Sequence, residues 1–314
     1  MKIIAEFCQN HNGDKRILEE MIAIVNEIGV SHAKIQNIYA DNLTYRPQFE
    51  NGIEINGEVL SIKRPYEQEY NRLKKLELNN DLVNLFVEKC EEVIPMTTCF
   101  FRSDIQNIIN QGFKSVKVAS YDCGSHSMIN ELKGNFNEII ISTGASFDDE
   151  IIKTAKILNG SNFTFLHAIT KYPTELKDMH LNRMNFLSSF TNNFGFSDHT
   201  NSIINGNLSS MVAIYIGAKC IERHFTILPK DNTRDGKVSV NPEELIELLN
   251  FSKLNKEQQL EIILSKSNNW KILLGDMKRT LSKEELLNRD YYRGRFASIR
   301  NDNDKSHMVY NYES

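Results

Sequence analysis

The feature that most constrains the fold is a regular alternation of two kinds of segment along the chain. Eight short runs of mainly apolar and β-branched residues alternate with stretches whose apolar residues are spaced as on one face of a helix, such as RILEEMIAIVNEI from Arg16. Strands joined by crossover helices form parallel sheets, and eight such units predict an α/β protein with a closed (β/α)8 TIM barrel. The predicted strands are KIIAEFC from Lys2, HAKIQNI from His32, EVIPMTT from Glu92, SVKVAS from Ser115, EIIIST from Glu138, FTFLHAI from Phe163, NFGFSD from Asn193 and AKCIERHFT from Ala218.

An open, doubly wound sheet is the alternative architecture. Its phosphate-binding fingerprint GxGxxG is absent after the first strand, where the sequence reads QNHNGD, and this favours the barrel. With 314 residues, 40% of them hydrophobic, the chain can form a barrel and a small appendage. We predict a barrel domain over residues 1–255 and a helical, lysine-rich C-terminal extension over 256–314. Between Tyr39 and about Leu78, a long polar loop after the second strand is typical of a lid or an interface arm.

Charge, hydropathy and cysteine usage exclude several classes of protein. The 37 basic and 41 acidic residues are mixed along the chain, so no basic patch indicates a nucleic-acid partner. No apolar run approaches the roughly 20 residues that span a bilayer, and the start is too short and too soon acidic for a signal peptide. We therefore predict a cytoplasmic protein with no membrane partner. The five cysteines show no CxxC spacing, which indicates reduced thiols.

Polar residues gather at the carboxyl ends of seven predicted strands. These ends meet at one mouth of a (β/α)8 barrel, where the reactive groups of such enzymes lie. The residues concerned are Gln9, Asn10, His11 and Asn12; Lys34 and Gln36; Lys117, Ser120 and Asp122; Ser142, Thr143 and Gly144; His167 and Thr170; Ser197, Asp198 and His199; and Glu222 and His224.

Two of these residues are lysines that should face the barrel interior. Lys34 and Gln36 lie two apart on a strand and so share one face. Because an ammonium group is costly to bury unpaired, Lys34 and Lys117 together indicate a bound anion with phosphate and carboxylate groups. The alternative is that each lysine pairs with an interior carboxylate, namely Glu6, Asp122 or Glu222.

Two histidines end neighbouring predicted strands. His199 and His224 should lie about 5 Å apart, the spacing of adjacent strands, which lets both imidazoles reach one ion. Without a thiolate nearby, Mn²⁺ or Mg²⁺ fits this pair better than structural zinc. A single histidine is more often a hydrogen-bonded core residue, and this is the interpretation for His167 and His126.

The series of strand-end motifs resembles the sialic acid synthase family. The resemblance runs from about Lys2 to Pro242 and depends on AEFCQNHNGD, AKIQ, SVKVAS, ISTGAS, HAITKYPT, GFSDHT, GAKCIERHFTI and DNTRDGKVSVNP in that order. Members of this family condense phosphoenolpyruvate with an N-acetylhexosamine-type aldehyde, such as N-acetylmannosamine, on the same barrel. The resemblance thus implies a transferase that forms a carbon–carbon bond and releases a 2-keto-3-deoxy sugar acid and phosphate.

The resemblance also implies a role for each matching position. His199 and His224 would be the ligands of a divalent metal, Mn²⁺ or Mg²⁺. The positions that bind phosphoenolpyruvate in the family are Lys34, Thr98, Lys117, Ser120, Ser142, Thr170 and Ser197 here. Those that hold the amino sugar are Gln36, Tyr172 and Asp235, and Asn10, His11 and Asn12 belong to the same substrate site. The catalytic set is Lys34, Gln36, Lys117, Asp122 and Glu222, in which the two acids equally suit a role in orienting their neighbours.

The implied reaction begins when carbon 3 of phosphoenolpyruvate attacks the aldehyde, which the metal polarises. Water adds to carbon 2, and the resulting hemiketal phosphate collapses. Many members carry a C-terminal domain resembling antifreeze protein, which supplies an arginine to the partner subunit's site, so a homodimer is implied. Here Ser314 follows shortly after YRGRFASIRND, which resembles the linker into that domain. We expect the domain to be lacking, and the role of its arginine to be either lost or taken by another group, for example from the Tyr39–Leu78 loop.

Other functions fit the same residues. The acceptor can instead be a diacetamido sugar, as in legionaminate and pseudaminate synthases, or a sugar leading to a keto-deoxy sugar phosphate. A non-catalytic barrel would turn over no aldehyde. A Schiff-base aldolase using Lys34 or Lys117 would need no metal, and the paired histidines argue against it.

Overall fold

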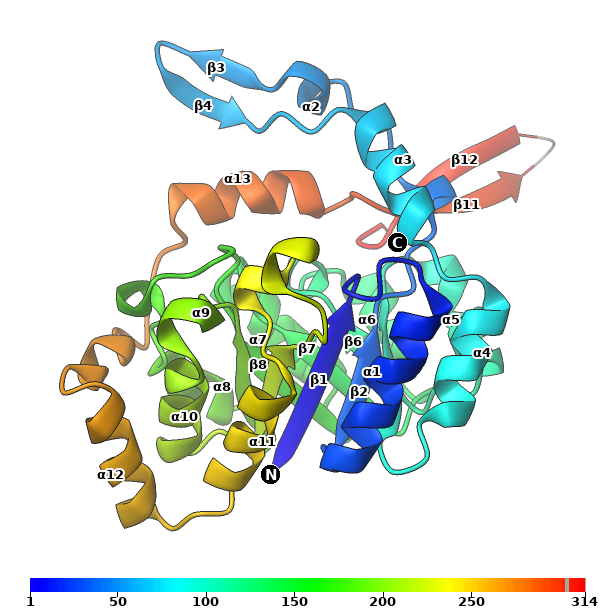
Figure 1. The fold of residues 1–314 in the computed structure, drawn as a ribbon. Helices are drawn as coiled ribbons and strands as arrows, with labels where there is room; N and C mark the ends of the chain where they lie inside the picture. Colours follow the sequence, from blue (N-terminus) through cyan, green and yellow to red (C-terminus); the bar gives the residue numbers. More distant parts are fainter. Residues whose placement is uncertain (303–304, 314) are drawn as a thin grey trace.

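Eight parallel strands form a closed barrel in the computed structural model, which describes residues 1–302 and 305–313 (Figure 1). Neighbours around the barrel follow the order of the chain, and β10 closes it by pairing with β1. The strands are β1 (Lys2–Cys8), β2 (His32–Ile35), β5 (Ile94–Cys99), β6 (Ser115–Val118), β7 (Glu138–Ser142), β8 (Phe163–His167), β9 (Phe194–Asp198) and β10 (Cys220–His224). The predicted (β/α)8 barrel is confirmed, and each predicted run overlaps one of its strands.

Helices cover the outside of the barrel. Those of the βα units are α1 (Lys15–Ile28), α4 (Asn80–Lys89), α5 (Ile105–Asn110), α6 (His126–Leu132), α7 (Asp148–Ile157), α8 (Arg183–Ser188), α9 (Ser202–Asn205), α10 (Leu208–Tyr215) and α11 (Pro242–Phe251). Short 3₁₀ helices are η1 (Ala40–Asn42), η2 (Arg102–Asp104), η3 (Ser120–Asp122), η4 (Leu176–Asp178), η5 (Lys230–Asn232), η6 (Gly236–Val238) and η7 (Trp270–Leu273). Helix α1 begins where the Asp14 side chain accepts a hydrogen bond from the backbone of Arg16, and it ends at Gly29, whose φ is +74°.

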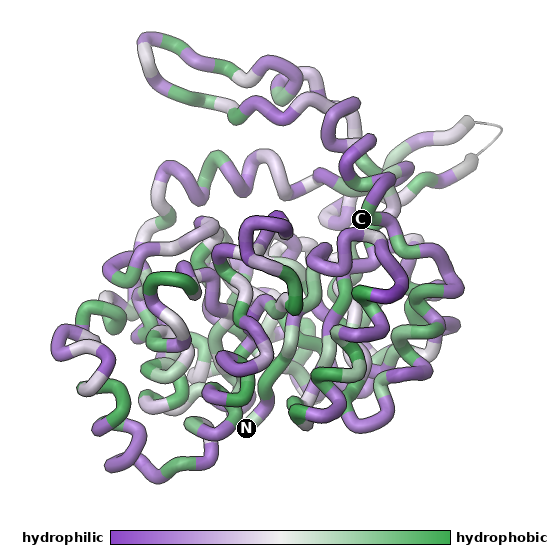
Figure 2. The backbone as a smooth tube through the Cα atoms, viewed as in Figure 1, coloured by the Kyte–Doolittle hydropathy of each residue, from purple (hydrophilic) through white to green (hydrophobic). Residues whose placement is uncertain are grey.

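The alternation of side chains along each strand divides the barrel into an outer apolar core and a layered interior. On β1, Ile3, Ala5 and Phe7 pack against the helices, whereas Ile4 points inward. Figure 2 shows the hydrophobic residues concentrated in this body of the molecule. The middle interior layer is apolar and consists of Ile4, Met96, Ile140, Leu166 and Cys220.

Polar layers lie on either side of this apolar layer. At the amino ends of the strands, Glu138 contacts His32 Nε2 at 3.1 Å and accepts a hydrogen bond from Ser115 Oγ at 3.2 Å. At the carboxyl ends lie the charged side chains of Lys34 and Lys117. The apolar layer separates the two ends, so the mouth is the place for chemistry.

His167 is the hydrogen-bonded core histidine that the sequence predicted. Its Nε2 lies 2.7 Å from the backbone oxygen of Met179, and burial lowers its pKa from 6.5 to about 3. Protonation of His167 is therefore easier in the unfolded state than in the folded state. The contribution of the neutral ring to the unfolding free energy is complete above pH 6.5 and is lost as the pH falls toward 3. Between pH 7 and pH 5 this residue should cost about 2 kcal/mol of unfolding free energy.

Urea unfolding at both pH values tests this expectation. His167→Gln keeps an N–H donor without a titrating ring, so its loss of stability between pH 7 and pH 5 should be smaller by about that amount. An equal loss in the variant and the parent would contradict the assignment.

The segment between β2 and α4 is structured, whereas the sequence suggested a long loop. It contains η1, α2 (Gln48–Asn51), the hairpin of β3 (Ile53–Ile55) and β4 (Glu58–Ser61), and α3 (Tyr66–Leu76). The hairpin projects from the barrel (Figure 1) and carries exposed Ile53, Ile55 and Leu60. Hydrophobic and hydrophilic residues are mixed along it (Figure 2), so its two short strands were not predicted from the sequence.

The C-terminal extension is only partly helical. Helices α12 (Lys256–Lys266) and α13 (Lys283–Tyr292) are present, but the chain then forms an antiparallel hairpin of β11 (Ala297–Asp302) and β12 (Lys305–Tyr310). The helical prediction was therefore wrong after Tyr292. In this hairpin Ile299, Val309 and Tyr310 are β-branched or aromatic residues, which favour strands. The lysine-rich composition of the extension obscured this preference. The extension packs on the barrel, since the Lys256 ammonium donates to the Ile214 backbone oxygen at 3.2 Å; the domain boundary at residue 255 stays a prediction.

Helix α13 crosses above the barrel mouth (Figure 1). It and the residues that follow it pack against the segment that carries α2 and α3. Thr44 Oγ1 donates to the Gly294 backbone oxygen at 2.7 Å, and the rings of Phe49 and Tyr291 meet edge to face with centroids 5.0 Å apart. Residues 39–78 and 283–295 together are called the roof below.

Two further expectations concern the whole chain. In the part of the chain that the structure describes, no helix is long and apolar enough to span a bilayer. All five cysteines are free thiols, as predicted.

Candidate active site

A cavity of about 420 Å³ lies between the carboxyl ends of the strands and the roof. Most of the predicted site residues line it, and they come from seven of the eight strands or the loops that follow them. The predicted residues on its wall are Lys34, Gln36, Thr98, Lys117, Ser120, Ser142, Tyr172, Ser197, His199, Glu222, His224 and Asp235. The position of the predicted site at the strand ends therefore agrees with the structure.

Two lysines and two glutamates form a buried charged layer at the base of the cavity. Lys117 Nζ donates to both oxygens of Glu222, at 2.5 and 2.7 Å. Lys34 forms an ion pair with Glu6 and lies 3.7 Å from Glu222. All four side chains are at most 5% exposed. The interior pairing considered as the alternative to a bound anion is thus present, with Glu6 and Glu222 as the partners.

These pairs shift the acid–base properties of the layer. Burial alone would raise the pKa of Glu222, but the charges of Lys117 and Lys34 hold it well below its usual range. Burial lowers the pKa of Lys34 to about 7, against the opposing effect of Glu222. Lys34 therefore gains or loses a proton easily near neutral pH, and a nearby anion would favour its charged form.

Small hydroxyl side chains surround the charged layer. Ser197 donates to Glu222 at 2.7 Å, and Thr98 accepts from Lys34 at 3.2 Å. Ser120 and Ser142 lie on the same wall and are buried. Ammonium groups beside short hydroxyls offer hydrogen-bond donors at close range, which suits recognition of phosphate and carboxylate oxygens.

The two predicted metal ligands lie next to each other at the ends of β9 and β10. Their ring centroids are 5.6 Å apart, and the Tyr172 ring contacts His199 with centroids 4.3 Å apart. His199 Nδ1 lies 2.8 Å from the backbone oxygen of Ile169. This contact requires the N–H on Nδ1 and places the lone pair on Nε2, which lies 3.4 Å from the Ser197 hydroxyl oxygen.

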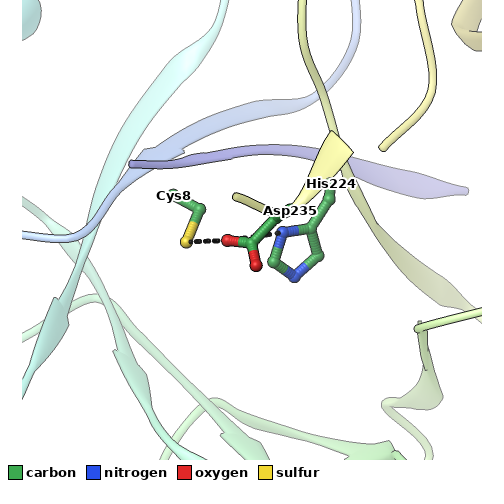
Figure 3. Close-up of side chains that lie close together, drawn as sticks. All are labelled: Cys8, His224 and Asp235. Atoms are coloured by element: carbon green, nitrogen blue, oxygen red, sulfur yellow. Dashed lines mark hydrogen bonds and ion pairs between the residues drawn. The ribbon is translucent and has the colours of Figure 1, made fainter. Parts of the chain in front are cut away.

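His224 faces a thiol and a carboxylate on its other side. Its buried Nδ1 has no hydrogen-bond partner and lies 3.8 Å from an oxygen of Asp235, which accepts a hydrogen bond from Cys8 Sγ at 2.8 Å (Figure 3). Ligand atoms of Cys8, His224 and Asp235 all lie within 4.8 Å of one another. The expectation that no thiol lies near the histidines was therefore wrong, because Cys8 ends β1, the neighbour of β10.

This arrangement fits a divalent metal ion. Burial lowers the pKa of His224 to about 4, so its ring is neutral and able to bind a cation at neutral pH. The unpartnered Nδ1 of His224 and the Asp235 carboxylate provide nitrogen and oxygen donors of the kind that such ions take.

Five predicted site residues lie outside the cavity wall. Asn10 donates to the Phe225 backbone oxygen at 2.8 Å, and His11 Nδ1 accepts from the backbone of Gly13, so both stabilise the loop after β1. The remaining three are exposed Asn12, buried Thr170, and Asp122, which is held by Ser125 and Asn311. Motif position alone did not show that these five residues do not line the cavity.

Four arginines on the cavity wall were not found from the sequence. Arg64 and Arg72 come from the segment after β2, Arg234 follows β10, and Arg295 follows α13. The roof also contributes Glu284, Asn288 and Tyr292. The sequence indicated only that a group from the Tyr39–Leu78 segment could take over the role of the family's arginine, and Arg64 and Arg72 come from that segment.

The fold and the cavity define a (β/α)8-barrel protein with the strand-end site of an enzyme. Residues 21–261 match the model of the NeuB family. N,N'-diacetyllegionaminic acid synthase of Legionella pneumophila is 30% identical over 257 residues, which cover 79% of this chain and 70% of that protein. Pseudaminic acid synthase of Campylobacter jejuni is 25% identical over 300 residues, 94% of this chain and 81% of that protein.

A solved structure shares the fold. N-acetylneuraminic acid synthetase of Leptospira borgpetersenii, in complex with citrate, superposes with a TM-score of 0.69 at 23% identity, covering 92% of this chain and 90% of that chain. This chain belongs to the NeuB family. It is an enzyme of the type to which the sialic, legionaminic and pseudaminic acid synthases belong.

Proposed function

We propose that the enzyme condenses phosphoenolpyruvate with an N-acetylhexosamine-type aldehyde, such as N-acetylmannosamine, to give a 2-keto-3-deoxy sugar acid and phosphate. The observation that supports this most directly is the meeting of Lys34, Lys117, His199 and His224 on one cavity wall. Cationic and hydroxyl groups suit an enol phosphate, and paired histidines suit a metal that holds a carbonyl oxygen.

The lysines are proposed to bind the two anionic groups of phosphoenolpyruvate. Glu6 and Glu222 neutralise Lys34 and Lys117, so the arginines at the rim would supply the positive charge that attracts the substrate. Arg64 and Arg234 are exposed there. Ser120, Ser142 and Ser197 would donate to the phosphate or carboxylate oxygens.

The metal is proposed to be held by His199 and His224 and to act as a Lewis acid on the aldehyde oxygen when it is bound. The ring of Tyr172 and the roof above it would orient the sugar and exclude water. Attack by carbon 3 on the aldehyde forms the new bond, water adds at carbon 2, and the hemiketal phosphate releases phosphate. The charged layer would stabilise the negative charge that shifts between carboxylate, phosphate and new hydroxyl oxygens.

A diacetamido acceptor is a second candidate. Relatives of this chain at 25–30% identity are named N,N'-diacetyllegionaminic acid synthase and pseudaminic acid synthase, and the first name denotes a product with two acetyl groups. We propose further that the protein is a cytoplasmic homodimer. The projecting hairpin with exposed Ile53, Ile55 and Leu60 supports a second copy as its partner.

A phosphate-release assay with phosphoenolpyruvate, Mn²⁺ and a panel of N-acetylated aldoses and diacetamido sugars tests both function and acceptor. One aldose should give phosphate and keto acid in equal amounts, and omission of metal should stop the reaction. If none of the sugars in the panel gave phosphate release, this would count against the proposal. Borohydride trapping of a Schiff base would also count against it.

Lys117→Ala should mainly weaken the binding of phosphoenolpyruvate. Loss of a charge-assisted hydrogen bond costs about 1.5–3 kcal/mol, so the apparent KM should rise by about 10- to 100-fold. Steady-state kinetics at saturating acceptor measures it. An unchanged KM for phosphoenolpyruvate would show that Lys117 serves the ion pair alone.

A further inference from the structure

We propose that Cys8 is a direct metal ligand, and that with His224 and Asp235 it makes a site for Zn²⁺, Fe²⁺ or Co²⁺ in preference to Mg²⁺ or Mn²⁺. The inference refines the metal of the proposed function, and it also stands as a binding property that needs no substrate. It changes the expectation drawn from the sequence, which assumed oxygen and imidazole ligands only.

The three donor atoms converge from separate parts of the fold. Cys8 is the last residue of β1, His224 the last of β10, and Asp235 lies in the loop that precedes η6. Sγ, the ring nitrogen and the carboxylate oxygen lie within 4.8 Å of one another, which leaves room for one ion between them (Figure 3). With metal–sulfur bonds of about 2.3 Å and metal–nitrogen or metal–oxygen bonds of about 2.0–2.2 Å, donor atoms of one ion lie at such separations.

The free ring nitrogen is independent evidence for a missing ligand. His224 is 6% exposed, and its Nδ1 points toward Asp235 without a hydrogen-bond partner. Buried polar atoms are normally satisfied, so an unpartnered one calls for an explanation such as an ion. A cation between His224, Asp235 and Cys8 would satisfy it.

The backbone at Cys8 is also unusual. Its φ is +49°, in the left-handed region that favours glycine, and the pairing of β1 with β2 shifts register between Glu6 and Cys8. Such a conformation costs about 1 kcal/mol or more in a residue with a side chain, and it occurs mostly at functional sites. Here it turns the thiol toward the Asp235 carboxylate.

A thiolate changes which ions the site prefers. Soft sulfur ligands select Zn²⁺, Fe²⁺ and Co²⁺, whereas carboxylate, carbonyl and water ligands suit Mg²⁺ and Mn²⁺. As the metal–sulfur bond forms, the Cys8 S–H bond breaks and its proton passes to solvent. His199 is not one of these three donors, and its ring centroid lies 5.6 Å from that of His224.

The test is a Co²⁺ titration of the full chain after removal of metal, without substrates. Direct ligation should give one bound Co²⁺ per chain and a thiolate-to-cobalt charge-transfer absorption in the near ultraviolet. In Cys8→Ser this absorption should vanish. Because loss of an outer partner already weakens metal binding by about 10- to 100-fold, loss of this ligand should weaken Co²⁺ binding by at least about 100-fold.

Cys90→Ser is the matched control, since Cys90 lies at the end of α4 outside the cavity. That variant should keep both absorption and affinity. Co²⁺ bound to the parent protein without the charge-transfer absorption would overturn the proposal, and so would absence of Co²⁺ binding. Phosphate release with no such absorption would support the proposed function alone, whereas the absorption without phosphate release would support the Cys8 site alone.

Discussion

Replacing His224 with alanine is expected to abolish metal-dependent phosphate release. Without this imidazole, the two or three remaining donors would be too few to hold the ion in place. The reaction would then lose the several kcal/mol of transition-state stabilisation that a Lewis acid supplies. Since about 1.4 kcal/mol corresponds to a tenfold change in rate, the loss should reach at least about 1,000-fold. Bound metal per chain should fall in parallel.

His126→Ala is the matched control for this change. His126 is a half-buried histidine of α6 away from the cavity wall, so activity and metal content should stay within about twofold, as expected for a substitution outside the site. Near-normal activity of His224→Ala, with its thermal unfolding unchanged, would refute the assignment of His224 as a ligand.

Glu222→Gln is expected to have the largest effect on stability. The change keeps the shape of the side chain but removes the charge that Lys117 contacts at 2.5 and 2.7 Å. Breaking a buried ion pair by removing one partner typically costs about 3–5 kcal/mol, because the other charge stays buried and unpaired. Urea unfolding at pH 7 measures this cost.

A bound anion should offset part of that cost. Inorganic phosphate can take the place of the lost carboxylate beside Lys117, so rising phosphate should stabilise Glu222→Gln more than the parent protein. Glu138→Gln makes the same chemical change at the opposite end of the barrel, where Lys2 is 35% exposed and water can solvate the freed charge. It should cost less and show no extra response to phosphate. An equal response in both variants would argue against an anion site at Lys117.

The barrel and the position of the site follow from local patterns in the sequence. Strand alternation is a short-range property, so inward Lys34 and outward Ile35 can be assigned from spacing alone. The neighbouring positions of His199 and His224 then follow from the order of parallel strands. The partners of the lysines were also foreseen among the interior carboxylates, because a buried ammonium needs a charge beside it.

The roof and the thiol did not follow from local patterns. Arg72 and Arg295 are more than 200 residues apart in the chain. They reach the cavity only because α3 and the segment after α13 pack together. Asn10 and Asp122 follow strand ends yet do not line the cavity, because hydrogen bonds with Phe225 and Asn311, residues distant in the chain, hold their side chains. Cys8 was interpreted as an ordinary buried thiol, since a positive φ cannot be read from residue type when the residue is not glycine.

The division of the cavity wall between strand ends and roof has an evolutionary consequence. The groups proposed to bind the donor belong to the barrel, whose closure tolerates little change, whereas Glu284, Asn288 and Tyr292 belong to a helix laid over it. Descendants of one ancestral gene can therefore diversify in the sugar they accept through substitutions in that helix, while the machinery for the shared co-substrate is inherited intact.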